Sequence, residues 1–305
     1  MSQDSKKTID IKKLLKSVLH FDSSDLHLVP GSEPQIRIDK ELKPLNLPIL
    51  DADEIEEMAY SLIADKQKKV FEEDNELDFS FELDNIGRFR ANYYRTIAGI
   101  GCAFRMIPID IPTLDEYGNP PIFKELVKRE KGLILVTGPT GSGKSTTLAA
   151  IVDEANRTRK HHILTVEDPL EFLHVLQKPV INHREVGTHT RSFAAALRGA
   201  VREDPDRILV GEMRDVETIR LALTAAETGH LVFSTLHTSS APKTVDRIID
   251  VFPAGEKSMV RSMLSESLRA VVTQTLLKRI GGGRVAAWEI MIATPAIRNL
   301  IREDK

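Results

Sequence analysis

The chain has 305 residues, of which 41% are hydrophobic and 29% are charged, a balance typical of a globular protein with one large or two ordinary domains. The formal net charge of −3 gives no electrostatic reason to expect nucleic acid as the main partner. The single cysteine, Cys102, excludes an internal disulfide framework and a cysteine-cluster zinc site, and we interpret it as a small core residue.

The N-terminal segment and the hydropathy of the chain bear on where the protein works. No apolar run approaches the roughly 18–20 residues that a membrane-spanning helix requires. Residues 1–10 are polar and carry lysines, with no apolar segment behind them, so they lack the pattern of a secretory signal. We therefore expect a cytoplasmic protein that contacts a membrane only through partner proteins.

The first third of the sequence predicts a small mixed α/β unit that begins with two helices. Residues 11–19 place apolar side chains at helical spacing, with lysines on the opposite face that we interpret as solvated. Asp51 can cap a second helix together with Glu54, three residues later. One apolar stripe then runs along this helix, formed by Ile55, Met58, Ala59, Leu62 and Ile63.

The hydrophobic period then changes from that of a helix to that of a strand. Residues 77–83 and 89–93 alternate apolar and polar side chains on either side of the turn 85–87, which predicts a β-hairpin. A third strand is expected over residues 103–107. Prolines punctuate the connector that follows, at positions 108, 112, 120 and 121, and they place the boundary between an N-terminal domain, 1–112, and a second domain, 113–305.

The second domain alternates apolar strands with helical segments, which is typical of a parallel sheet covered by helices. Its strands are short and continuously apolar, as expected when both faces of the sheet are buried. They are predicted at residues 133–137, 163–166, 208–210 and 231–235.

A complete phosphate-binding loop, or Walker A motif, follows the first of these strands and opens a helix. Its glycines let successive backbone N–H groups turn toward phosphate, and the helix N-terminus adds its positive dipole end. We expect Lys144 to reach the β- and γ-phosphates of ATP and the Ser145 hydroxyl to ligate Mg²⁺. The predicted nucleotide-binding residues are Gly138, Pro139, Thr140, Gly141, Ser142, Gly143, Lys144, Ser145 and Thr146.

Carboxylates end two other predicted strands of the second domain. Glu212 follows the third apolar strand, where a Walker B acid would lie beside the metal ion. Glu167, Asp168 and Glu171 cluster at the end of the second strand. One of these three could orient or deprotonate an attacking water molecule, and the alternative interpretation is a solvated turn.

Two histidines, His230 and His237, flank the fourth predicted strand. Taken alone, each is more often structural than catalytic. A zinc site is unsupported, because no third ligand stands at the spacing that a metal site requires.

These residues resemble a known family, the secretion ATPases of the type II and type IV pilus machinery, over almost the whole chain. The resemblance implies an N-terminal PAS-like α/β domain joined to a RecA-like P-loop ATPase domain with a mostly parallel sheet. It also implies assembly as a hexameric ring that uses ATP and Mg²⁺. The segments that carry it are residues 24–28, the Walker A loop, residues 167–171, 211–215 and 217–223, the histidine-flanked strand and residues 296–301.

The same resemblance assigns roles to the polar residues. Glu171 is the first choice for activating water and Glu167 the second, whereas Glu212 would act through Mg²⁺. His237 and His230 would contact the γ-phosphate side. Arginines of the N-terminal domain would reach the ATP of a neighbouring subunit, a task that suits a permanently charged, forked guanidinium. The matching strand positions are held by Arg88, Arg90 and Arg105.

Within the family, the residues most resemble the ATPases that drive type IV pilus retraction and twitching motility. The implied partners are further copies in a homohexamer, an inner-membrane pilus platform protein and related retraction or extension ATPases, which would hold the protein at the inner membrane. Four alternatives stay open: an accessory retraction ATPase, a pilus-extension or type II secretion ATPase, a type IV secretion ATPase, and a ring component that binds nucleotide without turnover.

The C-terminal segment allows two interpretations. Residues 296–301 resemble a segment that this family associates with retraction, and an amphipathic helix that packs on its own domain explains the pattern equally well. Relatives continue with further helices, so we expect a chain that is truncated at Lys305.

Overall fold

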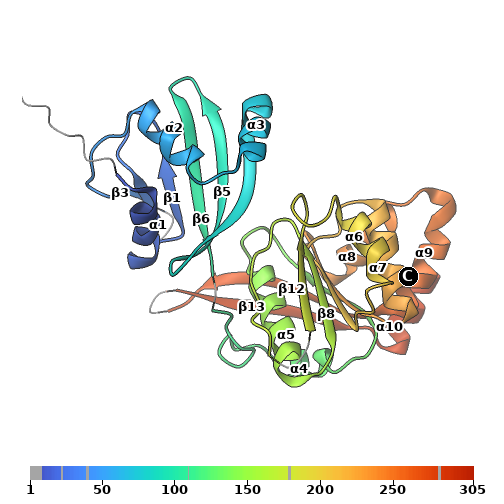
Figure 1. Cartoon of the computed structure of the whole chain (residues 1–305). Coiled ribbons are helices and arrows are strands. Elements are labelled where there is room, and N and C mark those ends of the chain that lie inside the picture. Colours follow the sequence, from blue (N-terminus) through green and yellow to red (C-terminus); the bar gives the residue numbers. More distant parts are fainter. Residues whose placement is uncertain (1–8, 22, 39–40, 109, 178–179, 281–282) are drawn as a thin grey trace, which may run out of the picture. The chain divides into compact units, whose positions relative to one another are not determined.

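The computed structural model describes residues 9–21, 23–38, 41–108, 110–177, 180–280 and 283–305 (Figure 1). Contacts between Cα atoms divide the chain into two compact units, Met1–Ile109 and Asp110–Lys305, and each unit is described by itself. Within the described ranges, no helix is both long and apolar enough to cross a membrane.

The first unit is built on a six-stranded antiparallel sheet with the strand order β3-β2-β1-β6-β5-β4. Apolar side chains of the sheet form one core with Leu14, Ile55 and Phe71 from the three helices. Cys102 is fully buried in this core. The elements of the unit are α1 (Ile11–His20), β1 (Asp25–Leu28), β2 (Gln35–Ile38), β3 (Glu41–Pro44), α2 (Ala52–Tyr60), α3 (Asp65–Asp74), β4 (Glu76–Leu83), β5 (Gly87–Thr96) and β6 (Gly99–Ile107).

Helix α2 begins with the capping box that the sequence predicts. The Asp51 carboxylate accepts the Glu54 N–H at 2.9 Å, and the Glu54 carboxylate accepts the Asp51 N–H at 2.9 Å. The predicted apolar stripe extends too far, however, because the helix ends at Tyr60. Leu62 and Ile63 follow the helix and still pack against the core of this unit.

The predicted hairpin and the strand after it are confirmed as β4, β5 and β6, which pair as an antiparallel meander. Helix α3 and the strands β1, β2 and β3 were not predicted. Each of these three strands has only four residues, so its alternation of apolar and polar side chains is too short to distinguish it from a loop.

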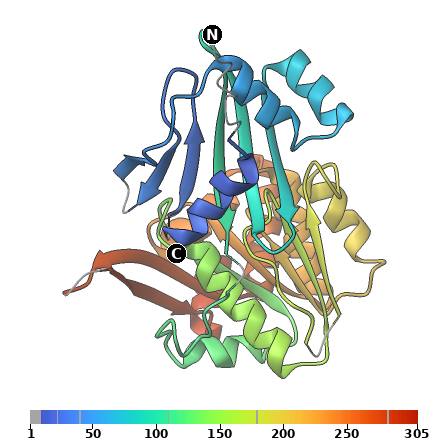
Figure 2. The ribbon, with the colours of Figure 1, turned by 60° about the vertical axis from the view of Figure 1, so that its left-hand side comes forward.

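The second unit contains a seven-stranded sheet with the order β13-β12-β7-β11-β10-β8-β9. All neighbouring strands are parallel except the edge strand β13, which forms a long antiparallel hairpin with β12 (Figure 2). Its elements are α4 (Ile122–Val127), β7 (Gly132–Thr137), α5 (Lys144–Thr158), β8 (His162–Glu167), β9 (Val180–Glu185), α6 (Phe193–Ala200), β10 (Arg207–Val210), α7 (Val216–Thr228), β11 (Leu231–Leu236), α8 (Ala241–Asp250), α9 (Lys257–Ser267), β12 (Leu268–Lys278), β13 (Arg284–Ile292) and α10 (Pro295–Glu303).

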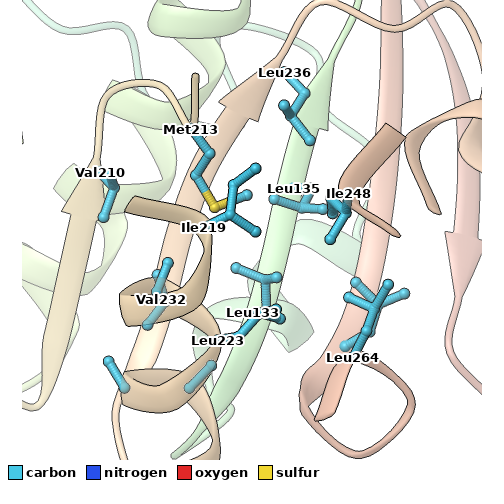
Figure 3. Close-up of a cluster of buried hydrophobic side chains, with 14 of the residues drawn as sticks. Leu133, Leu135, Val210, Met213, Ile219, Leu223, Val232, Leu236, Ile248 and Leu264 are labelled. Carbon is cyan, nitrogen blue, oxygen red and sulfur yellow. The ribbon is translucent and has the colours of Figure 1, made fainter. Parts of the chain in front are cut away.

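Helices cover both faces of this sheet, and alternate residues of a strand therefore belong to different cores. Leu133 and Leu135 of β7 pack with α6, α7, α8 and α9, whereas Ile134 and Val136 pack with α4 and α5. Figure 3 shows the first core, in which strand side chains lie among residues of α7, α8 and α9. The four predicted strands and the mostly parallel α/β architecture are confirmed.

The C-terminal segment forms the amphipathic helix α10. Ile301 is buried, and Ile297 packs against the core that contains Leu133 and Leu135. The helix is capped by Thr294, whose side chain accepts the N–H of Ile297. The packing interpretation of residues 296–301 is therefore sufficient to explain their apolar pattern.

Candidate functional site

The four predicted motifs of the second unit follow four adjacent strands. β7, β11, β10 and β8 are neighbours in that order and run parallel, so their carboxyl ends meet at one edge of the sheet. The Walker A loop follows β7, His237 follows β11, and Glu212 follows β10. Glu167 is the last residue of β8. In open α/β sheets, ligands bind at this edge. The fold therefore brings Gly138 and His237, which are 99 positions apart in the chain, to the same edge of the sheet.

The backbone of the phosphate loop requires glycine at both of its ends. Gly138 has φ +141°, and a Cβ there would lie 2.2 Å from the backbone oxygen of Gln274. Gly143 has φ +86° and forms the N-cap of α5. A Cβ on Gly143 would lie 2.8 Å from Gln274 Nε2 and 2.8 Å from the Tyr117 hydroxyl. The loop can therefore follow this path only with residues that lack a side chain at these positions.

Lys144, the first residue of α5, is buried and points back over the loop. Its Nζ donates hydrogen bonds to the carbonyl oxygens of Gly138 at 3.0 Å and Pro139 at 3.1 Å. Burial lowers the pKa of Lys144, and the nearby charges of Glu212 and Glu171 oppose that shift. The ammonium thus lies at the loop, where a lysine binds the phosphate chain, and it is influenced by the charges of two of the predicted acidic residues.

Glu212 links β10 to the end of β11. Its carboxylate lies 3.3 Å from His237 Nε2 and 2.8 Å from Arg214 Nε. The hydroxyl of Thr235 donates to the Gly211 carbonyl at 2.6 Å, which ties the residue before Glu212 to β11. The structure therefore brings together Glu212 and His237, as predicted from the sequence, and adds Arg214 to them.

Glu167 is a buried carboxylate at the end of β8. Burial raises its pKa to about 7, against the opposing effect of hydrogen bonds from the Glu171 N–H and the Thr165 side chain. The Glu171 N–H donates to Glu167 Oε2 at 3.2 Å, and the Glu171 side chain is exposed. The two candidate bases are thus joined by a hydrogen bond from the backbone of Glu171 to the side chain of Glu167. The Glu167 side chain is buried, whereas the Glu171 side chain is exposed.

A pair of histidines behind Glu167 was not predicted. The rings of His174 and His183 stack with centroids 5.7 Å apart, and the His174 N–H donates to His183 Nε2 at 3.3 Å. The other ring nitrogen of His183, Nδ1, lies 2.9 Å from the Thr165 hydroxyl and shares a hydrogen bond with it. Burial lowers the pKa of His174 to about 3 and keeps it neutral. This chain of hydrogen bonds ends at Glu167.

His230 does not join the other predicted residues. It precedes β11, whose six residues span roughly 20 Å, and so lies at the opposite edge of the sheet from the phosphate loop. Its Nδ1 is 3.0 Å from the Ala225 carbonyl at the end of α7. His230 therefore cannot contact the γ-phosphate of a nucleotide bound by the phosphate loop of the same chain, because the length of β11 separates them, and the prediction is corrected in this respect.

The three predicted arginines lie on β5 and β6 of the first unit. Arg90 and Arg105 are directly opposite each other, and Arg88 is opposite Ile107. Arg105 Nε lies 2.8 Å from the buried carboxylate of Asp25, and an Arg90 amino group lies 3.6 Å from Asp78. Arg105 and Arg90 remain 65% and 40% exposed, so their charged ends are accessible to another molecule.

The residues at the sheet edge fit a nucleotide with its magnesium ion better than a metal held by protein alone. Among the described residues, no group of three or more His, Cys, Asp and Glu side chains could hold a metal ion. Magnesium commonly keeps several waters and binds through one or two protein oxygens plus phosphates. The Ser145 hydroxyl and the Glu212 carboxylate are oxygens of this type at the loop and at β10.

Residues of β12 and of the segment before α4 also belong to this site and were missed. Gln274 contacts the phosphate loop, and Tyr117 lies close to Gly143. The only sequence signal was a run of three polar residues, Thr273, Gln274 and Thr275, between the apolar residues 270–272 and 276–277. Periodicity cannot reveal which loop such residues meet, because the strands β7 and β12 are far apart in the chain.

Known proteins resemble this chain in sequence and in fold. A family model described as type II/IV secretion system protein matches residues 2–304. The type IV pilus retraction ATPase PilT of Pseudomonas aeruginosa is 59% identical over 97% of this chain and 86% of its own length. The type IV pilus ATPase PilU of the same organism is 36% identical over 97% of this chain and 78% of its own length.

Solved structures agree with the sequence comparison. A crystal structure of the pilus retraction motor PilT with bound ADP has a TM-score of 0.94 and 48% identity to this chain, and the match covers 97% of this chain and 87% of that one. The resemblance predicted from the motifs is thereby confirmed.

Proposed function

Because the chain belongs to the family of type II/IV secretion system proteins, we propose that it is an ATP-hydrolysing motor that retracts type IV pili. The observation that carries this proposal is the 59% identity to PilT over 97% of the chain. The lower identity to PilU, 36%, favours the main retraction ATPase over the accessory one. The complete phosphate loop and its buried lysine supply the chemistry that such a motor needs.

Binding of ATP begins at the phosphate loop. The N–H groups between Gly138 and Lys144 and the N-terminus of α5 bind the phosphates, and Lys144 exchanges its carbonyl partners for the β- and γ-phosphate oxygens. Ser145 and Glu212 would hold Mg²⁺, which would neutralise charge on the phosphates. His237, 3.3 Å from Glu212, lies on the γ-phosphate side of the site.

Hydrolysis requires a water molecule that is oriented toward the γ-phosphate. We assign Glu171 as the base for this water, as the resemblance to the family implies; its side chain is exposed, and its charge influences Lys144 of the phosphate loop. Glu167 holds the backbone of Glu171 by accepting its N–H, and its own pKa of about 7 makes it the second candidate for the proton.

Assembly into a homohexameric ring completes the site. Arg105, Arg90 and Arg88 of one subunit act on the ATP of the next, where a guanidinium stabilises charge on the transferred phosphoryl group. Asp25 holds the Arg105 guanidinium at 2.8 Å and limits its rotamers. Closure of each interface then couples hydrolysis to movement of the first unit, and an inner-membrane platform protein transmits that movement to the pilus.

The test is replacement of the gene in its host by variants, with surface pili counted and twitching scored. Deletion and Lys144→Ala are both expected to give abundant pili on cells that do not twitch, because pili extend and are not withdrawn. Lys128→Ala, at an exposed lysine of the same unit, is the matched control and should twitch normally. Cells without surface pili after deletion would indicate an extension ATPase instead. Cells with normal pili and a secretion defect would indicate a secretion ATPase.

A further inference from the structure

Gln274 is a fully buried polar residue on β12, a strand that carries none of the recognised motifs. β12 pairs with β7 in parallel register, with Thr273 opposite Thr137, so Gln274 comes next to Gly138 where the phosphate loop begins. Burial of an amide is unfavourable unless its hydrogen bonds are made. The partners of this amide therefore indicate what it does.

Every donor and acceptor position of the Gln274 amide has a partner. Nε2 donates to the Ser142 carbonyl at 2.7 Å and is 3.4 Å from the Tyr117 hydroxyl. Oε1 accepts from the Thr147 hydroxyl at 2.6 Å and from Trp288 Nε1 at 3.3 Å. The two shortest hydrogen bonds are those with Ser142 in the loop and with Thr147 in the first turn of α5. These two residues lie on either side of Lys144 in the phosphate site.

The bond to the Ser142 carbonyl has a consequence for the next N–H group. In a trans peptide, the C=O and the N–H that follows it point in opposite directions. Because the Ser142 carbonyl points at Gln274, the Gly143 N–H points away from β12, toward the interior of the loop where phosphate binds. Nε2 also lies so close to Gly143 that a Cβ there would be 2.8 Å from it, so only glycine fits beside the amide.

We propose that Gln274 is a positioning residue that orients the Gly143 N–H toward the nucleotide phosphates and ties the loop to α5 through Thr147. This inference rests on the proposed function of the loop as a nucleotide site. An apolar residue of similar size would fill the same space but would leave the buried Ser142 carbonyl and the Thr147 hydroxyl without this partner, which is unfavourable. A role in stability alone and a role in positioning the loop therefore differ in one respect, because only the second affects nucleotide binding. The amide forms its two short hydrogen bonds with the Ser142 carbonyl of the loop and the Thr147 hydroxyl of helix α5.

The experiment measures the Kd of the full chain for ADP and for ATP with Mg²⁺, and the KM and kcat of ATP hydrolysis. Gln274→Met keeps the length of the side chain and removes the amide. We expect it to raise both Kd values about tenfold, since a loop N–H that is no longer oriented loses its bond to phosphate. The KM for ATP should rise similarly while kcat changes less than about twofold, because the backbone N–H groups of such a loop bind the α- and β-phosphates, which are not transferred.

Two further variants keep the test decisive if Gln274→Met folds poorly. Thr147→Val removes only the hydroxyl that holds Oε1 and should raise both Kd values about threefold. Trp288→Phe removes only the longer of the two hydrogen bonds to Oε1, at 3.3 Å, and should raise both Kd values less than Thr147→Val does. A folded Gln274→Met or Thr147→Val protein with wild-type Kd values, and only a lower Tm, would overturn the inference. Absence of nucleotide binding by the wild-type chain would instead refute the proposed function.

Discussion

At the scale of single residues, Glu167 shows how burial tunes a carboxyl group at the edge of a parallel sheet. The side chain ends β8, in which Ile163, Leu164 and Val166 are apolar and buried, and little water reaches it. Desolvation disfavours its charged form and raises its pKa to about 7, while the Glu171 N–H and the Thr165 hydroxyl, itself tied to His183, limit the rise. The group is therefore able to gain or lose a proton near neutral pH.

The raised pKa of Glu167 predicts a pH-dependent difference in stability between the wild type and Glu167→Gln. A carboxyl group whose pKa is about 7 when folded and 4.5 when unfolded stabilises the fold fully below pH 4.5 and loses that contribution as the pH rises through 7. The free energy of unfolding of the wild type should thus fall relative to Glu167→Gln by about 3 kcal/mol between pH 4.5 and pH 8.

Urea unfolding of both proteins across this pH range measures the difference directly. Other titrating groups, such as His174, are present in both proteins and cancel in the comparison. A difference that stays constant from pH 4.5 to pH 8 would show that Glu167 has an ordinary pKa.

At the scale of elements, helix α7 holds the acidic end of β10 in place. Its N-cap, Asp215, is only three residues beyond Glu212, and its carboxylate accepts the N–H of Thr218 at 2.8 Å and the Thr218 hydroxyl at 2.6 Å. Ile219 and Leu223 then anchor the helix in the core beneath the sheet (Figure 3). The cap thus fixes where the chain leaves β10 and where Glu212 lies.

Loss of this cap should be measurable as a loss of stability. Asp215→Ala leaves the first N–H groups of α7 without a side-chain acceptor and is expected to lower the free energy of unfolding by about 1 kcal/mol. Asp215→Asn keeps an acceptor oxygen and is the matched control, with a change of only a few tenths of a kcal/mol expected. Equal destabilisation by the two substitutions, measured by urea unfolding, would show that charge rather than capping matters here.

At the scale of the whole molecule, the proposed chemistry is divided between the two compact units. The second unit carries the phosphate loop, Glu212 and Glu171, and the first unit carries the three arginines on β5 and β6, Arg88, Arg90 and Arg105. In the first unit, Asp25 of β1 lies opposite both Arg37 and Arg105, and Arg105 lies opposite Arg90. In our proposal Arg88, Arg90 and Arg105 serve the neighbouring subunit, so activity belongs to the ring rather than to the single chain.

A mixing experiment tests this division of labour. Lys144→Ala subunits lack a working phosphate loop and keep their arginines, whereas Arg105→Ala subunits keep the loop. Each variant alone should hydrolyse ATP slowly, and mixed rings should regain part of the wild-type rate, because some interfaces then combine an intact loop with an intact arginine.

The control for mixing is Arg95→Ala, which removes an arginine at the end of β5 that lies over the Phe71 ring. This variant should retain near-wild-type turnover without mixing. A mixture of the Lys144 and Arg105 variants that is no more active than the sum of its parts would exclude Arg105 as a residue supplied in trans.

The sequence by itself determined the features that depend on local patterns. The hairpin β4–β5, the capping box at Asp51 and the apolar strands β7, β8, β10 and β11 follow from periodicity and capping, which act over a few residues. The phosphate loop was recognisable because its spacing is fixed by the geometry of phosphate binding. The short strands β1, β2 and β3 escaped prediction because four residues carry too weak a pattern.

Only the tertiary structure decided which of these features meet. The strand order places Glu212 beside His237, because β10 and β11 are neighbours in the sheet. It also brings Gln274 against Ser142 and His183 against Thr165, contacts for which no local signal exists. Pairing between distant strands depends on how the whole sheet buries its two faces, and that information is spread over the chain rather than held in any motif.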